Sequence, residues 1–108
     1  MQQKAIVIGA GLAGLAASIR LSKKGIETHV FEANSFPGGK VNSKEHGGYR
    51  FDQGPSLLTC PEYIEELYTL CDKDFASFEM IDLETSFTYF FNDGLRMDLK
   101  KDQKQVID

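Results

Sequence analysis

The pattern of residues 4–32 restricts the fold of this chain more than any other feature. The segment "KAIVI" at 4–8 is short, apolar and rich in β-branched residues, which is typical of a strand buried on both faces of a parallel sheet. An apolar stripe at helical spacing follows it, and Lys23 and Gly25 supply the usual signals for a helix C-terminus. The segment 26–32 then alternates apolar and polar residues and predicts a second strand. This order predicts a right-handed βαβ unit with parallel strands.

Three glycines in a G-x-G-x-x-G pattern lie between the first expected strand and the helix. This context makes the pattern a specific signal of dinucleotide binding. Gly9 allows a tight turn, Gly11 leaves the backbone open to a pyrophosphate, and Gly14 lets the helix pack closely on the strands. The pyrophosphate would rest on N–H groups at the positive end of the helix.

An acidic residue, Glu32, ends the second expected strand, about twenty residues beyond the glycines. A carboxylate at this place can accept hydrogen bonds from the ribose hydroxyls of adenosine, and it disfavours NADP because it repels the extra phosphate. This unit alone leaves NAD and FAD both open. The alternative is a glycine turn that only packs a helix on a sheet, with Glu32 as a solvated charge; the register of strand, glycines, helix and acid favours nucleotide binding.

Length, charge and cysteine content narrow the class of protein. The 108 residues suit one domain at most, with a modest core. The formal net charge of −4 argues against a nucleic-acid partner, because phosphate binding needs clustered Lys and Arg. Cys60 and Cys71 lack a CxxC or Cys/His grouping, so we expect no disulfide framework and no metal site, and a reduced, cytoplasmic chain is the default. The apolar run 5–17 is too short to span a bilayer and has no convincing signal-peptide cleavage site.

The middle of the chain is expected to hold a loop and then a helix. Glycine and proline punctuate residues 34–55, which predicts an ordered loop with at most one short strand, at 49–52. Apolar residues recur with helical spacing over 61–72 and predict an amphipathic helix. Thr59 and Glu62 would form a capping box at its start.

The segment "FEANSFPGGKVNS" resembles the doublet-glycine extension that follows the nucleotide-binding unit in FAD-containing amine oxidases, carotenoid desaturases and their relatives. The positions that match the pattern of this family are Glu32, Gly38, Gly39, Lys40 and Ser43. The resemblance implies FAD as the cofactor: two adjacent glycines let the backbone pass close to it, and a cation adds charge near the pyrophosphate. Lys40 stands where many relatives have arginine, so a bidentate contact is not expected there.

From Phe78 onward the sequence is β-rich, and "TSFTYFFNDGLRMDL" predicts two strands joined at residues 92–94. This segment and "GYRFDQGPSLLTCPEYIEELY" resemble bacterial-type phytoene desaturases and related carotenoid desaturases, isomerases and saturases, and the match covers nearly the whole chain. The resemblance implies an α/β fold: a Rossmann-like βαβ unit in a glutathione-reductase-type FAD domain, incomplete here. Residues 1–76 would form the N-terminal part of that domain, and 77–108 would begin a β-rich substrate domain.

The candidate cofactor-binding residues all lie in one of three glycine-containing segments or beside Glu32. They are Gly9, Ala10, Gly11, Leu12, Ala13, Gly14, Glu32, Ala33, Gly38, Gly39, Lys40, Val41, Gly54, Pro55 and Ser56. For Gly54, Pro55 and Ser56, a strand end followed by a turn is as good an explanation as direct cofactor contact. No residue is a persuasive catalyst, since His29 lies in an expected strand and His46 in the expected loop.

The resemblance implies a function for a longer protein, of which this chain would be an N-terminal fragment, inactive alone and marginally stable. That protein would desaturate a carotenoid precursor such as phytoene, with FAD accepting hydride while the protein supplies orientation. Its substrate would be a lipophilic polyene, so peripheral contact with a membrane stays open. The alternatives are an amine oxidase, a protoporphyrinogen oxidase, a carotenoid isomerase, or a non-catalytic binding protein like the Rab GDP-dissociation inhibitors. The intact glycines with Glu32 favour nucleotide binding over the last of these.

Overall fold

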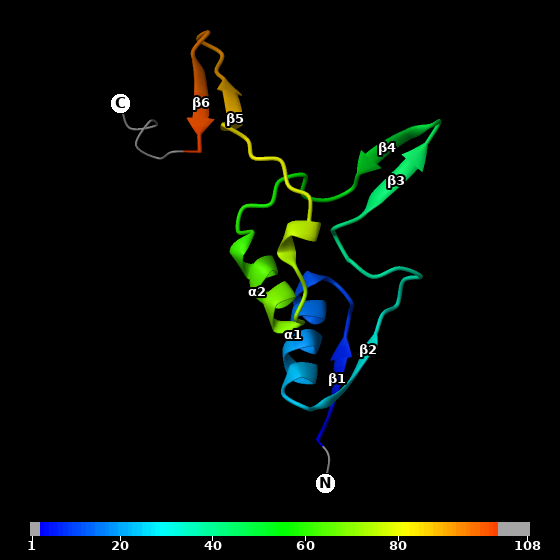
Figure 1. The fold of residues 1–108 in the computed structure, drawn as a ribbon. Coiled ribbons are helices and arrows are strands. Elements are labelled where there is room, and N and C mark those ends of the chain that lie inside the picture. The colour runs from blue at the N-terminus through cyan, green and yellow to red at the C-terminus, as the bar shows by residue number, and fades with distance from the viewer. Residues whose placement is uncertain (1–2, 102–108) are drawn as a thin grey trace. The chain divides into compact units, whose positions relative to one another are not determined.

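A computed structural model describes residues 3–101 of the chain (Figure 1). The chain divides into two compact units, with the boundary between Ser77 and Phe78. The first unit is mixed α/β and the second is a β-hairpin. The assignment of residues 1–76 to a cofactor domain and of 77–108 to a substrate domain stays a prediction. Within the described part of the chain, no helix has the length and apolar character needed to cross a membrane.

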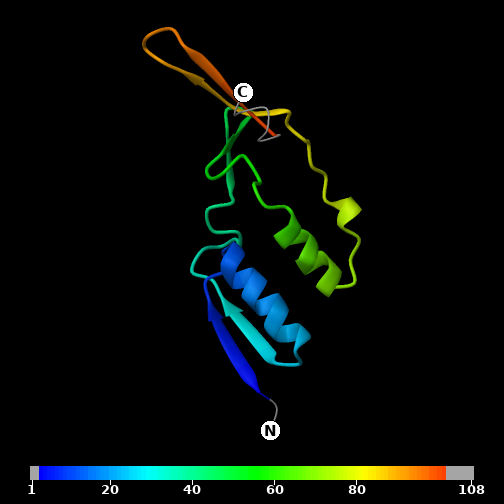
Figure 2. The ribbon, with the colours of Figure 1, turned by 90° about the vertical axis from the view of Figure 1, so that its left-hand side faces the viewer.

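The expected βαβ unit is confirmed. Strand β1 (Lys4–Ile8) leads to helix α1 (Leu12–Lys23) and then to strand β2 (Glu27–Phe31). The two strands are parallel, with a register that runs from Lys4 opposite Glu27 to Ile8 opposite Phe31. Figure 2 shows α1 lying along one face of this strand pair. The helix ends as expected, because Gly25 has a φ of 78° and so takes the left-handed conformation that glycine tolerates.

The opposite face of this strand pair is exposed, which differs from the expectation of a strand buried on both faces. Ile6 is 68% exposed and Ile8 is 87% exposed, whereas the alternate residues Ala5 and Val7 are half-buried. Side chains of a strand alternate between its two faces, and only one face of β1 is covered by α1. Among residues 3–101, Ala10 is the one apolar residue that counts as fully buried, so the core is thin.

The region expected to be a loop with at most one strand contains a hairpin, so that prediction was wrong by one strand. Strand β3 (Ser43–His46) pairs antiparallel with β4 (Tyr49–Asp52), and only β4 was expected. Gly47 and Gly48 join them, with φ values of 59° and 81°, which suit a two-residue hairpin turn. The sequence of β3, "SKEH", has no apolar alternation because this strand is largely exposed. The glycine pair that joins β3 to β4 was therefore a stronger sign of a hairpin than the sequence of β3 itself.

The expected second helix forms, but its capping box does not. Helix α2 runs over Glu62–Leu70, and a short 3₁₀ turn, η1, follows at Phe75–Ser77. Pro61 is the N-cap residue, and no side chain caps the helix. Its φ of −61° and ψ of −28° are already helical, and its carbonyl accepts bonds from the N–H groups of Ile64 and Glu65. The helix therefore begins too late for Thr59 to act as its cap.

Two ion pairs link α1 to the region of α2. Arg20 Nη2 lies 3.0 Å from Glu66 Oε2, and Lys23 Nζ lies 3.0 Å from Asp72 Oδ2. Both pairs are substantially exposed, so each contributes little to the free energy of unfolding. The apolar faces of the two helices lie toward each other and line a shared groove of about 690 Å³.

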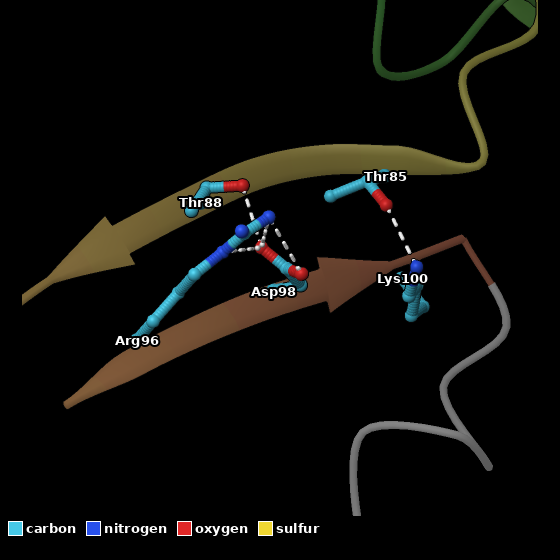
Figure 3. A network of polar contacts seen from close by, with 5 residues as sticks. All are labelled: Thr85, Thr88, Arg96, Asp98 and Lys100. Carbon is cyan, nitrogen blue, oxygen red and sulfur yellow. Dashed lines mark hydrogen bonds and ion pairs between the residues drawn. The ribbon is translucent and has the colours of Figure 1, made fainter.

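The second unit is the expected hairpin, formed by β5 (Thr85–Phe90) and β6 (Arg96–Lys100) in antiparallel register. Gly94 has a φ of 87° in the turn at 92–94, as its place in the turn predicts. A polar network covers one face of the hairpin (Figure 3): Asp98 accepts bonds from the Thr88 hydroxyl at 2.6 Å and from the Arg96 guanidinium. In the same view Lys100 Nζ donates to the Thr85 hydroxyl oxygen at 2.9 Å.

We expect Gly14→Ala to destabilise the first unit. A Cβ atom at Gly14 would overlap the carbonyl oxygen of Gly9, so the helix must move off the strand end. The cost of such overpacking is about 1–3 kcal/mol, measured as a lower midpoint in urea unfolding of the purified protein. Gly11→Ala is the matched control, because a Cβ there meets nothing within 4 Å. Equal midpoints for the two variants would show that the close approach at Gly14 is not needed.

Candidate dinucleotide-binding site

The turn between β1 and α1 is the centre of the candidate site. Gly9 has a φ of 96°, and its N–H donates to the Phe31 carbonyl at 2.7 Å, which ties the turn to the end of β2. Gly11 is the N-cap of α1, so no side chain covers the first turn of the helix, and that turn carries no acidic residue. Leu15 N–H is bonded to the Gly11 carbonyl, so the N–H groups of residues 12–14 precede the helical ladder. These N–H groups suit an anion such as a pyrophosphate.

The doublet glycines pack directly on this turn. Gly38 N–H donates to the Ala10 carbonyl at 2.7 Å, and Gly38 forms a parallel bridge with Gly11. Gly38 and Gly39 have φ values of 114° and 61°, which side chains rarely adopt. A Cβ on Gly39 would also lie 3.1 Å from the Gly11 Cα, closer than most real contacts. The structure therefore brings together the first two glycine segments, which are separated by more than twenty residues in the sequence.

A third segment joins through Gly54. A Cβ at this position would overlap the Lys40 carbonyl oxygen, so only glycine fits against the doublet segment here. Gln53 N–H donates to the Asn42 carbonyl at 2.8 Å and holds the same two segments together. This contact gives Gly54 a structural role that does not depend on a cofactor. Pro55 and Ser56 follow it as exposed residues, and within residues 3–101 neither forms a hydrogen bond.

Glu32 lies at the end of β2 with its carboxylate against the glycine turn. Its Oε2 accepts the Ala10 N–H at 2.7 Å, and its Oε1 accepts the Asn34 N–H at 2.9 Å and the Asn34 Nδ2 at 2.7 Å. These bonds hold the pKa of Glu32 below its ordinary value; the backbone N–H of Asn34 contributes most, followed by the N–H of Ala10 and the Asn34 amide. The carboxylate is thus ionised at neutral pH and is fixed beside the glycine turn between β1 and α1.

The remaining candidate residues make smaller contributions to the site. The side chains of Leu12 and Ala13 line the apolar groove between α1 and α2, so only their backbone N–H groups point to a cofactor role. The Lys40 side chain is exposed, as are Ala33 and Val41. His29 and His46 are also exposed, and His29 Nε2 lies 2.8 Å from Glu27 Oε1 in its own strand.

Sequence reasoning missed one residue of the site. Asn34 supplies two of the three hydrogen bonds that the Glu32 carboxylate accepts. The only signal was an asparagine two residues beyond the acid, and this spacing is typical of a local turn closed by a side chain.

Residues 7–73 match the family described as NAD(P)-binding Rossmann-like domain. The match covers more than half of the chain, so the chain belongs to this family, in agreement with the observed βαβ unit and glycine turn.

The curated relatives of this chain include desaturases and oxygenases of carotenoid compounds. The chain is 48% identical over 100 residues to 1-hydroxycarotenoid 3,4-desaturase of Flavobacterium sp. (strain P99-3), which covers 93% of this chain and 20% of the relative. It is 39% identical over 107 residues to 4,4'-diaponeurosporene oxygenase of Staphylococcus haemolyticus (98% of this chain, 21% of the relative). It is 39% identical over 104 residues to the neurosporene-forming phytoene desaturase of Rhodobacter capsulatus (95% and 20%). The resemblance to carotenoid desaturases is thus confirmed, and the chain spans about a fifth of the length of these relatives.

Solved structures agree on the fold. An oxidoreductase from Methanosarcina mazei is 35% identical, with a TM-score of 0.53 over 60% of this chain and 17% of that one. Putrescine oxidase bound to putrescine gives a TM-score of 0.62 over 95% of this chain and 22% of that one. At 24% identity the second likeness supports the fold alone.

Acidification should destabilise the protein in part through Glu32. Because its pKa is lowered by folding, its hydrogen bonds stabilise the native state above its ordinary pKa of 4.5, and this contribution is lost as the pH falls through the folded pKa. We expect Glu32→Gln to flatten the decline in urea midpoint as the pH falls from about 5.5 through the ordinary pKa of 4.5 and below it, and to leave the profile near pH 7 unchanged. Glu45→Gln, which alters an exposed glutamate of β3, is the control. An unchanged decline in Glu32→Gln would show that these bonds do not stabilise the fold.

Proposed function

We propose that this chain is the FAD-binding portion of a flavin-dependent carotenoid desaturase. The observation that carries the proposal is the packing of the Gly38-Gly39 backbone on the Gly9–Gly14 turn, with the Glu32 carboxylate bonded to the same turn. This arrangement offers N–H groups for a pyrophosphate and an acceptor for a ribose within one small region.

One feature disfavours NADP, and a second favours FAD over both nicotinamide cofactors named in the family description. The ionised Glu32 opposes the extra phosphate of NADP, which would meet a negative charge. The doublet glycines add a second stretch of backbone without side chains beside the first turn, and this extension resembles the one found in FAD-containing amine oxidases and carotenoid desaturases. The residues proposed to contact the cofactor are the candidate residues of the three glycine segments together with Glu32 and Ala33. Within this set, Gly54, Pro55 and Ser56 have the least support.

The cofactor, when bound, would supply the acceptor for hydride. The residues of this chain would bind and orient it. N–H groups of the first turn of α1 would hold the pyrophosphate, and the Glu32 carboxylate would accept a hydrogen bond from a ribose hydroxyl. Lys40 would add a positive charge without bidentate geometry. No residue of the chain is proposed to act on the substrate itself.

The proposed substrate is a lipophilic polyene, since the relatives' names describe desaturation or oxygenation of carotenoid compounds. Such a substrate partitions into lipid, so we also propose peripheral contact of the full-length protein with a membrane surface. The β5–β6 hairpin would begin the domain that holds the substrate. The second candidate is an amine oxidase, whose family shares the doublet-glycine extension by resemblance.

Gly11→Val should abolish FAD binding while leaving the fold intact. The Gly11 backbone has a φ of −72° and a ψ of 175°, which valine tolerates, and a Cβ there meets nothing within 4 Å. The branched side chain would therefore occupy the space proposed for the pyrophosphate without straining the protein. The full-length gene product should be yellow and release FAD on denaturation, whereas the variant should be colourless with an unchanged circular dichroism spectrum.

Ala17→Val is the control for this experiment, because it adds a branched side chain at an exposed position of α1. The control should bind FAD like the wild type. A wild-type product that stays colourless and cannot be reconstituted with FAD would refute the flavoprotein proposal, and full binding by Gly11→Val would refute the assigned site.

The substrate class is tested by pigment analysis. Cells that contain phytoene and express the full-length gene product should accumulate polyenes with longer conjugation and absorption at longer wavelength. Cells that express Gly11→Val should not, because the cofactor site is blocked. An unchanged pigment profile together with oxidation of supplied amines would favour the amine oxidase candidate instead.

A further inference from the structure

Asn34 places two donors on a single oxygen of Glu32. Its backbone nitrogen lies 2.9 Å from Glu32 Oε1, and its Nδ2 lies 2.7 Å from the same oxygen. A carboxylate only accepts hydrogen bonds, so the amide of Asn34 must present its nitrogen to it. The other oxygen, Oε2, accepts the Ala10 N–H at 2.7 Å. The three bonds fix both the position and the tilt of the carboxylate plane.

We propose that Asn34 is a positioning residue that holds the Glu32 carboxylate in the orientation needed to accept a ribose hydroxyl of the cofactor. This inference rests on the proposed function and assigns a role to a side chain that none of the glycine patterns includes. An ionised carboxylate has about four lone-pair sites, and Ala10 and Asn34 occupy three of them. We expect a ribose hydroxyl to use the acceptor capacity that these bonds leave on the carboxylate.

All of the groups that stabilise the ionised form of Glu32 are uncharged. The N–H groups of Asn34 and Ala10, the Asn34 amide and the N–H of Ala33 lower its pKa, and partial burial opposes them. No charged side chain contributes to this lowering. An aspartate at position 34 would place a negative charge within hydrogen-bond distance of this carboxylate, and like charges at this distance repel strongly.

The test compares Asn34→Asp and Asn34→Ala in the full-length gene product, with FAD affinity measured by quenching of flavin fluorescence between about pH 5 and pH 8. Asn34→Ala keeps the backbone bond and loses one bond to a charged group, so we expect FAD binding to weaken about tenfold at every pH. Asn34→Asp should bind more weakly still at pH 8 and should recover as the pH falls. A protonated aspartic acid has nearly the shape of asparagine and can donate to the Glu32 carboxylate as Asn34 does.

The recovery of FAD affinity in Asn34→Asp on acidification is the result that a merely structural role of Asn34 would not produce. The wild type should show no gain in affinity as the pH falls. Asn92→Asp, the same substitution in the β5–β6 turn, is the matched control and should follow the wild-type profile. A wild-type affinity and profile in Asn34→Asp would overturn the proposed role of Asn34.

A second measurement separates this inference from the proposed function. In the protein without cofactor, the carboxyl carbon of Glu32 is followed by NMR through a pH titration, and Asn34→Asp should raise the pKa of Glu32. If the wild type binds FAD but the pKa of Glu32 is the same in Asn34→Asp as in the wild type, the positioning role alone is refuted. Failure of the wild type to bind FAD would refute the proposed function, and the ribose-binding role of Asn34 would be refuted with it, whatever the titration shows.

Discussion

The close approach of two backbone segments, at Gly11 and Gly38, is the contact on which the rest of the candidate site depends. The Gly38 N–H donates to the Ala10 carbonyl at 2.7 Å, and a side chain at Gly39 would press on the Gly11 Cα. Gly39 can come this close because it lacks a side chain, whereas a Cβ on Gly11 would meet no atom within 4 Å. Gly54 extends the same principle, because it packs on the carbonyl of Lys40. The glycines therefore let these backbone segments pack closely beside the first turn of α1, whose N–H groups suit an anion.

Glu32 connects this surface to the sheet. It is the residue after β2, and its carboxylate bonds to the N–H of Ala10 inside the β1–α1 turn. The parallel register of β1 and β2 places the ends of the two strands side by side, so the acid reaches the turn without distortion. A charge in this place costs little, because N–H dipoles from Ala10 and Asn34 stabilise it. The carboxylate thus holds the β1–α1 turn against the end of β2.

The sequence predicted those parts of the molecule whose physical causes are local. Strand, glycine turn, helix and strand follow from periodicity and from the left-handed conformation that Gly9 and Gly25 adopt. The exposed strand Ser43–His46 was missed, because a strand with little burial carries no alternation of apolar residues. The capping box at Thr59 failed because Pro61 is itself the N-cap. Asn34 escaped notice since its role depends on where the neighbouring carboxylate points, and spacing does not fix that.

Different interactions stabilise the candidate site and the core, and for this reason we expect ligand binding to affect the free energy of unfolding. Hydrogen bonds and glycine contacts fix the turn between β1 and α1, whereas Ile6 and Ile8 on the uncovered face of β1 are 68% and 87% exposed. Little apolar burial therefore supports the unit that carries the site. A ligand that binds only the folded chain stabilises it by mass action, by about 2.7 kcal/mol at a concentration one hundred times its Kd. For a unit with so thin a core, we expect occupancy of the turn to raise the free energy of unfolding measurably, while the backbone contacts of the glycine segments hold the fold in the absence of a ligand.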